Sequence, residues 1–98
     1  MRREPKIGET LLYTLSEADI LTIRDVAKRQ GVLSVNPHEA GQIVPFIAVR
    51  LWPGEYPQNP EPLSKTGVNG QLILDGAMTL WRTSAGHGET PGYYQFAD

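Results

Sequence analysis

Hydrophobic and polar residues alternate or cluster in several short segments of the chain, a pattern typical of β-strands. Most connections between these segments contain glycine or proline. We expect strands over residues 8–15, 43–52, 68–74, 78–84 and 93–96. Pro45 cannot donate a hydrogen bond to a neighbouring strand, so the early part of the second strand is expected at a sheet edge or a bulge.

One segment has helical periodicity instead, from residue 17 to residue 30. Ser16 precedes it and Asp19 follows three positions later, a spacing that indicates an N-cap and its capping box. Gly31 follows the last turn and can take the left-handed conformation that ends a helix. We expect the helix to pack onto the sheet through one hydrophobic stripe, formed by Ile20, Ile23 and Ala27 with Leu21 and Val26 on its flank.

The pair Asp75-Gly76 separates two of the predicted strands. Asp-Gly between β-rich segments favours a tight hairpin in which both central residues have positive φ.

Together these elements predict one domain over residues 1–98, of the α+β class. We expect a small, mostly antiparallel β-sheet, or a partly closed barrel of SH3-like size, with one amphipathic helix after the first strand. Residues 1–6 are expected to be flexible, and residues 53–66 form a proline-rich loop.

Composition narrows the functional classes. The chain has no cysteine, which excludes disulfides and thiolate metal sites. Its net charge is −2 and its nine Lys and Arg residues are scattered, which argues against nucleic acid as a partner. No apolar stretch approaches the ~20 residues of a membrane span, so we expect no membrane partner and a cytoplasmic location. A domain this small has a narrow stability margin, which favours a homo-oligomer.

The sequence contains no complete catalytic motif. The two histidines stand beside carboxylates, as His38-Glu39 and His87-x-Glu89, and such pairs can share a metal ion or a proton. Their spacing matches no familiar site, so the favoured interpretation is surface loop residues. We therefore predict no enzyme activity, no catalytic residue, no metal and no cofactor.

A ligand site is predicted where the fourth strand ends in a glycine-rich turn. An aromatic ring next to an arginine can stack on a planar group while the arginine binds a phosphate. The candidate residues are Trp81, Arg82, Thr83, Ser84, His87 and Tyr94. Neighbouring side chains of a strand face opposite sides, so Trp81 and Arg82 can share a ligand only at a bulge, at a strand end or with a second subunit. Packing alone is the alternative role of the aromatic residues.

Three blocks of the sequence resemble a family of small uncharacterised proteins encoded by phages and prophages. They are residues 7–19, residues 40–46 followed by Val49-Arg50, and residues 68–76 with the following Trp81-Arg82-Thr83-Ser84, where the family usually has Trp-Ala-Thr-Ser. The resemblance implies a phage accessory protein, and a counter-defence role is one function that it suggests.

These observations favour a non-enzymatic binding protein that sequesters a small anionic, nucleotide-like signalling ligand. The alternative is a protein–protein module, either a virion accessory or an inhibitor of a host enzyme, acting through an edge strand and the proline-rich loop. A small hydrolase that uses His38 or His87 is the least favoured hypothesis.

Overall fold

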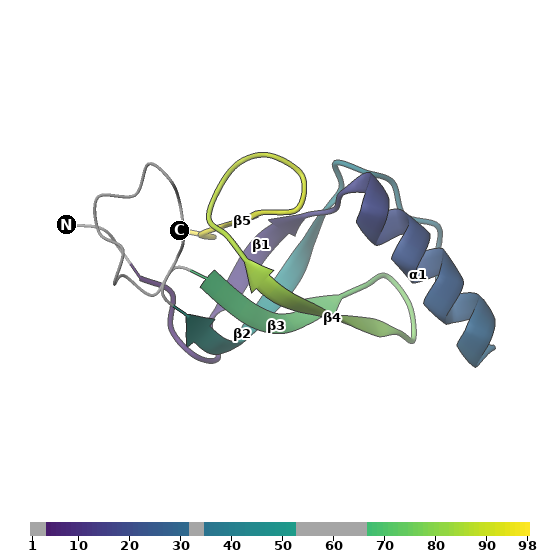
Figure 1. Ribbon diagram of the computed structural model, residues 1–98, viewed down its shortest axis with the longest axis horizontal. Helices are drawn as coiled ribbons and strands as arrows, with labels where there is room; N and C mark the ends of the chain where they lie inside the picture. The colour runs from purple at the N-terminus through teal and green to yellow at the C-terminus, as the bar shows by residue number, and fades with distance from the viewer. Residues whose placement is uncertain (1–3, 32–34, 53–66) are drawn as a thin grey trace.

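In the part of the chain that the structure describes, the strands form one antiparallel sheet with a single helix beside it (Figure 1). The computed structural model describes residues 4–31, 35–52 and 67–98. In chain order, the elements are β1 (Thr10–Thr14), α1 (Glu17–Gln30), β2 (Ile43–Trp52), β3 (Gly67–Ile73), β4 (Thr79–Ala85) and β5 (Tyr94–Gln95). The strand order is β4-β3-β2-β1-β5, and the sheet does not close into a barrel. The predicted α+β fold is confirmed, whereas the proline-rich segment 53–66 lies outside the described residues.

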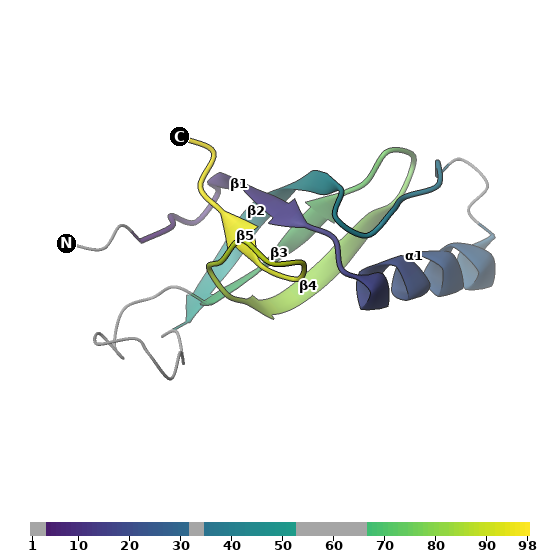
Figure 2. The same cartoon turned by 90° about the horizontal axis from the view of Figure 1, so that it is seen from above.

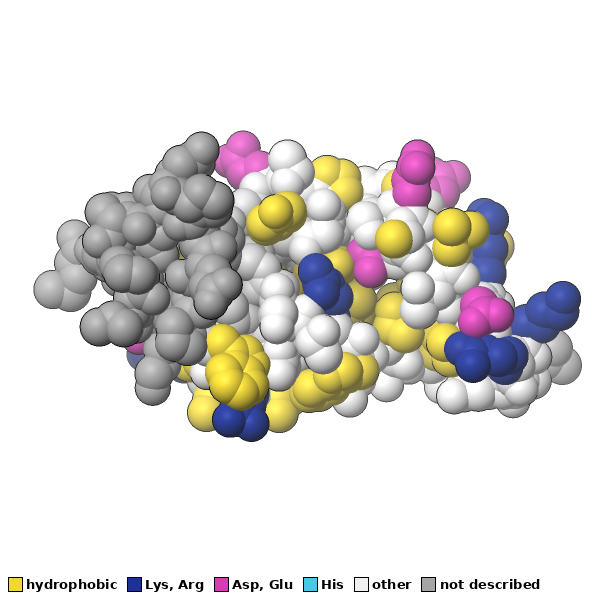
Figure 3. Space-filling view, viewed as in Figure 1, with side chains coloured by type: hydrophobic (Ala, Val, Ile, Leu, Met, Phe, Trp, Pro, Cys, Tyr) yellow, Lys and Arg dark blue, Asp and Glu magenta, His cyan; other side chains and the backbone are white. Residues whose placement is uncertain are grey.

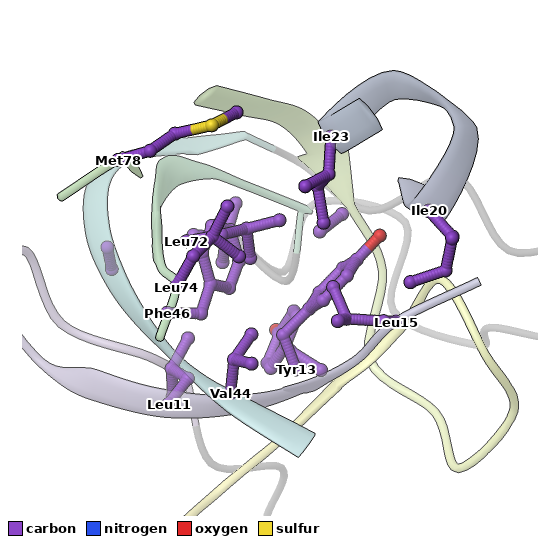
Figure 4. Close-up of a cluster of buried hydrophobic side chains, with 14 of the residues drawn as sticks. Leu11, Tyr13, Leu15, Ile20, Ile23, Val44, Phe46, Leu72, Leu74 and Met78 are labelled. Carbon is purple, nitrogen blue, oxygen red and sulfur yellow. The ribbon is translucent and has the colours of Figure 1, made fainter. Parts of the chain in front are cut away.

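The sheet curls around one hydrophobic core, and α1 lies at one end of it in both views (Figures 1 and 2). Alternate strand residues face inward, as the two-residue period of a strand requires. Ile20 and Ile23 of α1 point toward the same cluster (Figure 4). The strand residues of the core include Leu11, Tyr13, Val44, Phe46, Ala48, Val68 and Leu72.

Both ends of α1 are built as the sequence predicts. The Asp19 N–H donates to Ser16 Oγ at 3.1 Å, and the Ser16 N–H donates to Asp19 Oδ2 at 2.8 Å, which completes the capping box. Gly31 ends the helix with φ of 67°. The stripe of Ile20, Ile23 and Ala27 is buried, but Leu21 is 65% exposed and does not take part in the packing. No helix within the described residues is long and apolar enough to cross a bilayer.

Pro45 lies in β2, which is the central strand of the sheet. The first three residues of β2 pair with β1, where Pro45 faces Leu12. The register with β3 begins only at Phe46, which faces Leu72. The start of β2 is therefore paired on one side, as expected for a segment that contains a proline.

The predicted hairpin joins β3 to β4, and Gly76 has φ of 150°. The tight two-residue turn is wrong, however, because five residues, 74–78, connect the strands and Asp75 does not have positive φ. The backbone of Asp75 is occupied instead by contacts with the segment before β2. The Asp75 carbonyl accepts from the Asn36 N–H at 2.9 Å, and the Asp75 N–H donates to His38 Nε2 at 3.1 Å. These bonds hold the turn in a wider conformation.

We expect Ile23→Ala to lower the free energy of unfolding by roughly 2–4 kcal/mol, because Ile23 is 5% exposed and its loss leaves a cavity beneath α1. Leu21→Ala is the matched control on the same helix, since its side chain is 65% exposed and should cost less than about 0.5 kcal/mol. Urea denaturation followed by circular dichroism measures both. Equal losses in the two variants would contradict the packing of α1 through this stripe.

Candidate binding site on the outer face of the sheet

A β-bulge in β2 decides which side chains of that strand reach the surface. Val49 has no register partner on β3, because Ala48 and Arg50 pair with the consecutive β3 residues Gly70 and Asn69. If β2 paired regularly here, Arg50 would face inward like Ala48, since residues two apart share a face. The bulge instead turns Arg50 to the outer face, as bulges commonly redirect side chains.

The same shift brings Trp52 to the outer face, two residues after Arg50. The Arg50 guanidinium carbon Cζ lies 3.9 Å from the centroid of the Trp52 ring, a cation–π contact. Both side chains are exposed. Leu51, between them, packs against the core. The bulge thus displays a planar cation stacked on an aromatic ring.

A second bulge lies in β4, on the other side of β3. Thr83 and Ser84 together face the single β3 residue Asn69. Ser84 has φ of 51°, and its N–H donates to Asn69 Oδ1 at 2.6 Å. Asn69 therefore pairs with Arg50 on one side and holds the β4 bulge on the other. Because of this bulge, Ser84 is exposed together with Thr83 and does not share the inner face with Arg82.

Trp81 completes the surface. It pairs with Gln71 of β3, faces outward and is 47% exposed. We call the set formed by Arg50, Trp52, Asn69, Trp81, Thr83 and Ser84 the bulge patch. The structure thus brings together three of the predicted site residues, Trp81, Thr83 and Ser84.

Arg82 points the other way. It faces Gly70 on the inner side of β4, and its side chain reaches across the open side of the curled sheet. Its Nε donates to the Tyr13 hydroxyl at 2.9 Å, Nη2 donates to the Gly92 carbonyl at 3.3 Å, and Nη1 donates to the Thr83 carbonyl. Trp81 and Arg82 lie on opposite faces, as strand alternation predicts. The β4 bulge follows Arg82 and so does not reunite them.

Tyr13, the partner of Arg82, is fully buried. Its hydroxyl donates to Asp19 Oδ2 at 2.7 Å. Burial raises the pKa of Tyr13 to about 12, and the hydrogen bond to Asp19 adds to this, while Arg82 opposes it. Tyr13 is therefore a neutral donor at physiological pH. Its hydroxyl connects β4, through Arg82, to the first turn of α1, through Asp19.

The last two predicted site residues belong to a cluster of rings next to β5. Tyr94 is fully buried and packs edge-on against Phe96, with ring centroids 5.9 Å apart. His87 is exposed, and its ring centroid lies 5.5 Å from Tyr94 and 5.2 Å from Phe96. Neither residue lies on the bulge patch.

His38 is 5% exposed, so its interpretation as a surface loop residue is wrong. The burial follows from the bond that its Nε2 accepts from the Asp75 N–H, which fastens its loop to the β3–β4 turn. His38 Nδ1 is buried and has no hydrogen-bond partner among the described residues. Across residues 4–31, 35–52 and 67–98, no group of three or more metal-ligating side chains is present.

Comparison of the chain with models of protein families, with curated proteins and with solved structures found no match. The resemblance to phage accessory proteins therefore stays a prediction. The sequence analysis missed Arg50, Asn69 and Tyr13. The two-residue spacing of Arg50 and Trp52 indicates that they share a face, but only the bulge shows which face it is.

We expect alkaline titration to show a tyrosine pKa of about 12 that belongs to Tyr13 and is lost in Tyr13→Phe. The folded protein holds this proton more tightly than the unfolded chain. Its stabilising contribution is therefore complete below pH 10 and is lost as the pH rises toward about 12. Asp19→Asn should lower this pKa, because the hydrogen bond to the carboxylate favours the neutral phenol.

Ultraviolet absorbance of tyrosinate follows the titration. Glu17→Gln is the matched control, because Glu17 also lies in the first turn of α1. The assignment fails if Asp19→Asn and Glu17→Gln titrate alike.

Proposed function

We propose that this protein is a non-enzymatic binding module that docks a partner protein on the outer face of its sheet. One observation carries the proposal: the outer face of the described strands is free of acidic residues and carries exposed apolar side chains between β1 and β4. Ile43 is 55% exposed and Trp81 is 47% exposed. The residues of this outer apolar strip, which continues into the bulge patch, are Leu12, Ile43, Pro45, Ile47 and Ile73.

The composition of this face is that of a protein interface. Tryptophan and arginine are enriched at the centres of such interfaces, and other charged residues are depleted there. Figure 3, viewed as in Figure 1, shows charged side chains most densely at the helix end, with hydrophobic side chains and a few charged ones over the strands. The sheet curls away from the outer face, which is convex (Figure 4). A convex surface suits a protein better than a small molecule, which usually binds in a concave site.

Trp81→Ser and Ile43→Ser should each reduce capture of a partner that the wild-type protein retains, by at least about tenfold for the tryptophan. Leu21→Ser is the matched control, because it removes an exposed apolar side chain from α1 instead of from the sheet. Chemical cross-linking in the cells that express the protein, followed by quantitative mass spectrometry, measures capture. Circular dichroism confirms that each variant is folded.

A partner that all three variants lose, or that none of them loses, would place binding elsewhere on the molecule. Such a result would refute the outer face as the docking surface.

Binding of a small nucleotide-like anion is the second candidate function. The observation in its favour is the Arg50–Trp52 contact, which offers a cation and a ring on the same face as the hydroxyls of Thr83 and Ser84, with β3 between them. Arg50 then supplies the charge that the sequence analysis assigned to Arg82. Calorimetric titration with adenosine monophosphate and with cyclic dinucleotides tests it, with Arg50→Gln expected to weaken binding by roughly ten- to a hundredfold. Absence of heat from every nucleotide would exclude this candidate.

A further inference from the structure

We infer that the partner is a different protein, whose contact surface is apolar and presents a carboxylate to Arg50. This inference rests on the proposed docking face and names the chemistry of its occupant. It starts from the charge on that face. Of the outward-facing residues of β1 to β4, Arg50 is the only charged one.

Arg50 is prepared for an ionic contact. Its Cζ lies 3.9 Å from the centroid of the Trp52 ring, and the side chain is exposed, so an N–H edge of the guanidinium remains accessible to a partner. No described residue forms an ion pair with it. A carboxylate accepts two parallel hydrogen bonds from such an edge, and the stacked ring has already ordered the side chain.

Its position adds to the argument, because the β2 bulge is what brings Arg50 to this face. The outer face therefore presents one cation, Arg50, within an otherwise uncharged surface. Such a surface is complementary to a carboxylate that is surrounded by apolar groups.

A second copy of this chain does not fit as the occupant. In a two-fold contact between outer faces, each Arg50 would meet either the partner's uncharged strands or the partner's Arg50, since a two-fold interface pairs the same surface with itself. Neither arrangement gives the guanidinium a carboxylate from the described strands of the second copy. The charge pattern therefore favours a heterologous partner.

Three matched pools of extended synthetic peptides test the inference. In each pool, alternate positions vary among Leu, Ile, Val, Phe and Trp, and the positions between them are fixed as Asp, Asn or Lys. We expect the protein to bind the Asp pool about tenfold more tightly than the Asn pool, and the Lys pool least. Arg50→Gln should remove the preference for Asp over Asn, and Arg50→Lys should retain part of it. Trp81→Ser should weaken binding to the Asp and Asn pools equally.

The outcomes separate this inference from the proposal on which it rests. Equal binding of the Asp and Asn pools that depends on Trp81 would overturn the carboxylate and leave the docking face standing. No binding to any pool would count against both. A dimer in analytical ultracentrifugation that Trp81→Ser dissociates would show a second copy to be the occupant and would overturn the inference of a different protein.

Discussion

The buried hydroxyl of Tyr13 is the polar constraint on which the rest of the fold depends. A curled sheet that does not close leaves an open side, and a phenol buried there must find both a donor and an acceptor. Arg82 supplies the donor at 2.9 Å and Asp19 the acceptor at 2.7 Å. Asp19 also completes the capping box of α1, so one carboxylate fixes the start of the helix and its position against the sheet. The arginine, the tyrosine and the aspartate together replace the strand pairing that a closed barrel would have.

The inward position of Arg82 is linked to the outer surface through Gly70 of β3. Gly70 lies opposite Arg82 on one side and opposite Ala48 on the other, at the point where both ladders become irregular. A Cβ at Gly70 would stand 2.1 Å from the Ile47 carbonyl oxygen, so the backbones approach too closely for any other residue. The two bulges begin at the next residues of β2 and β4, and they bring Arg50, Trp52, Thr83 and Ser84 to the outer face. The inner and outer surfaces of the sheet are thus set by the same few residues.

Local signals in the sequence were sufficient to predict the helix, its caps, its buried stripe and the strands, because each depends on residues a few positions apart. The opposite faces of Trp81 and Arg82 followed from the two-residue period of a strand. The bulges did not follow, since they arise from the fit between three strands, and the outward position of Arg50 and of Ser84 was therefore missed. Likewise, the buried position of His38 depends on a bond to Asp75, 37 residues away, which no local pattern encodes. The bulge patch could be predicted only in part for this reason.

The placement of the two tryptophans has a spectroscopic consequence. Trp52 and Trp81 are the only tryptophans of the chain, and they are 37% and 47% exposed on the outer face, whereas the rings in the core belong to tyrosine and phenylalanine. Intrinsic tryptophan fluorescence should thus be red-shifted already in the native state and respond weakly to unfolding. The same emission becomes a direct reporter of occupancy, because any molecule that covers the outer face removes water from both indoles. The emission of Trp52 also reports where a molecule binds, because a charge that binds Arg50 changes the surroundings of the Trp52 ring.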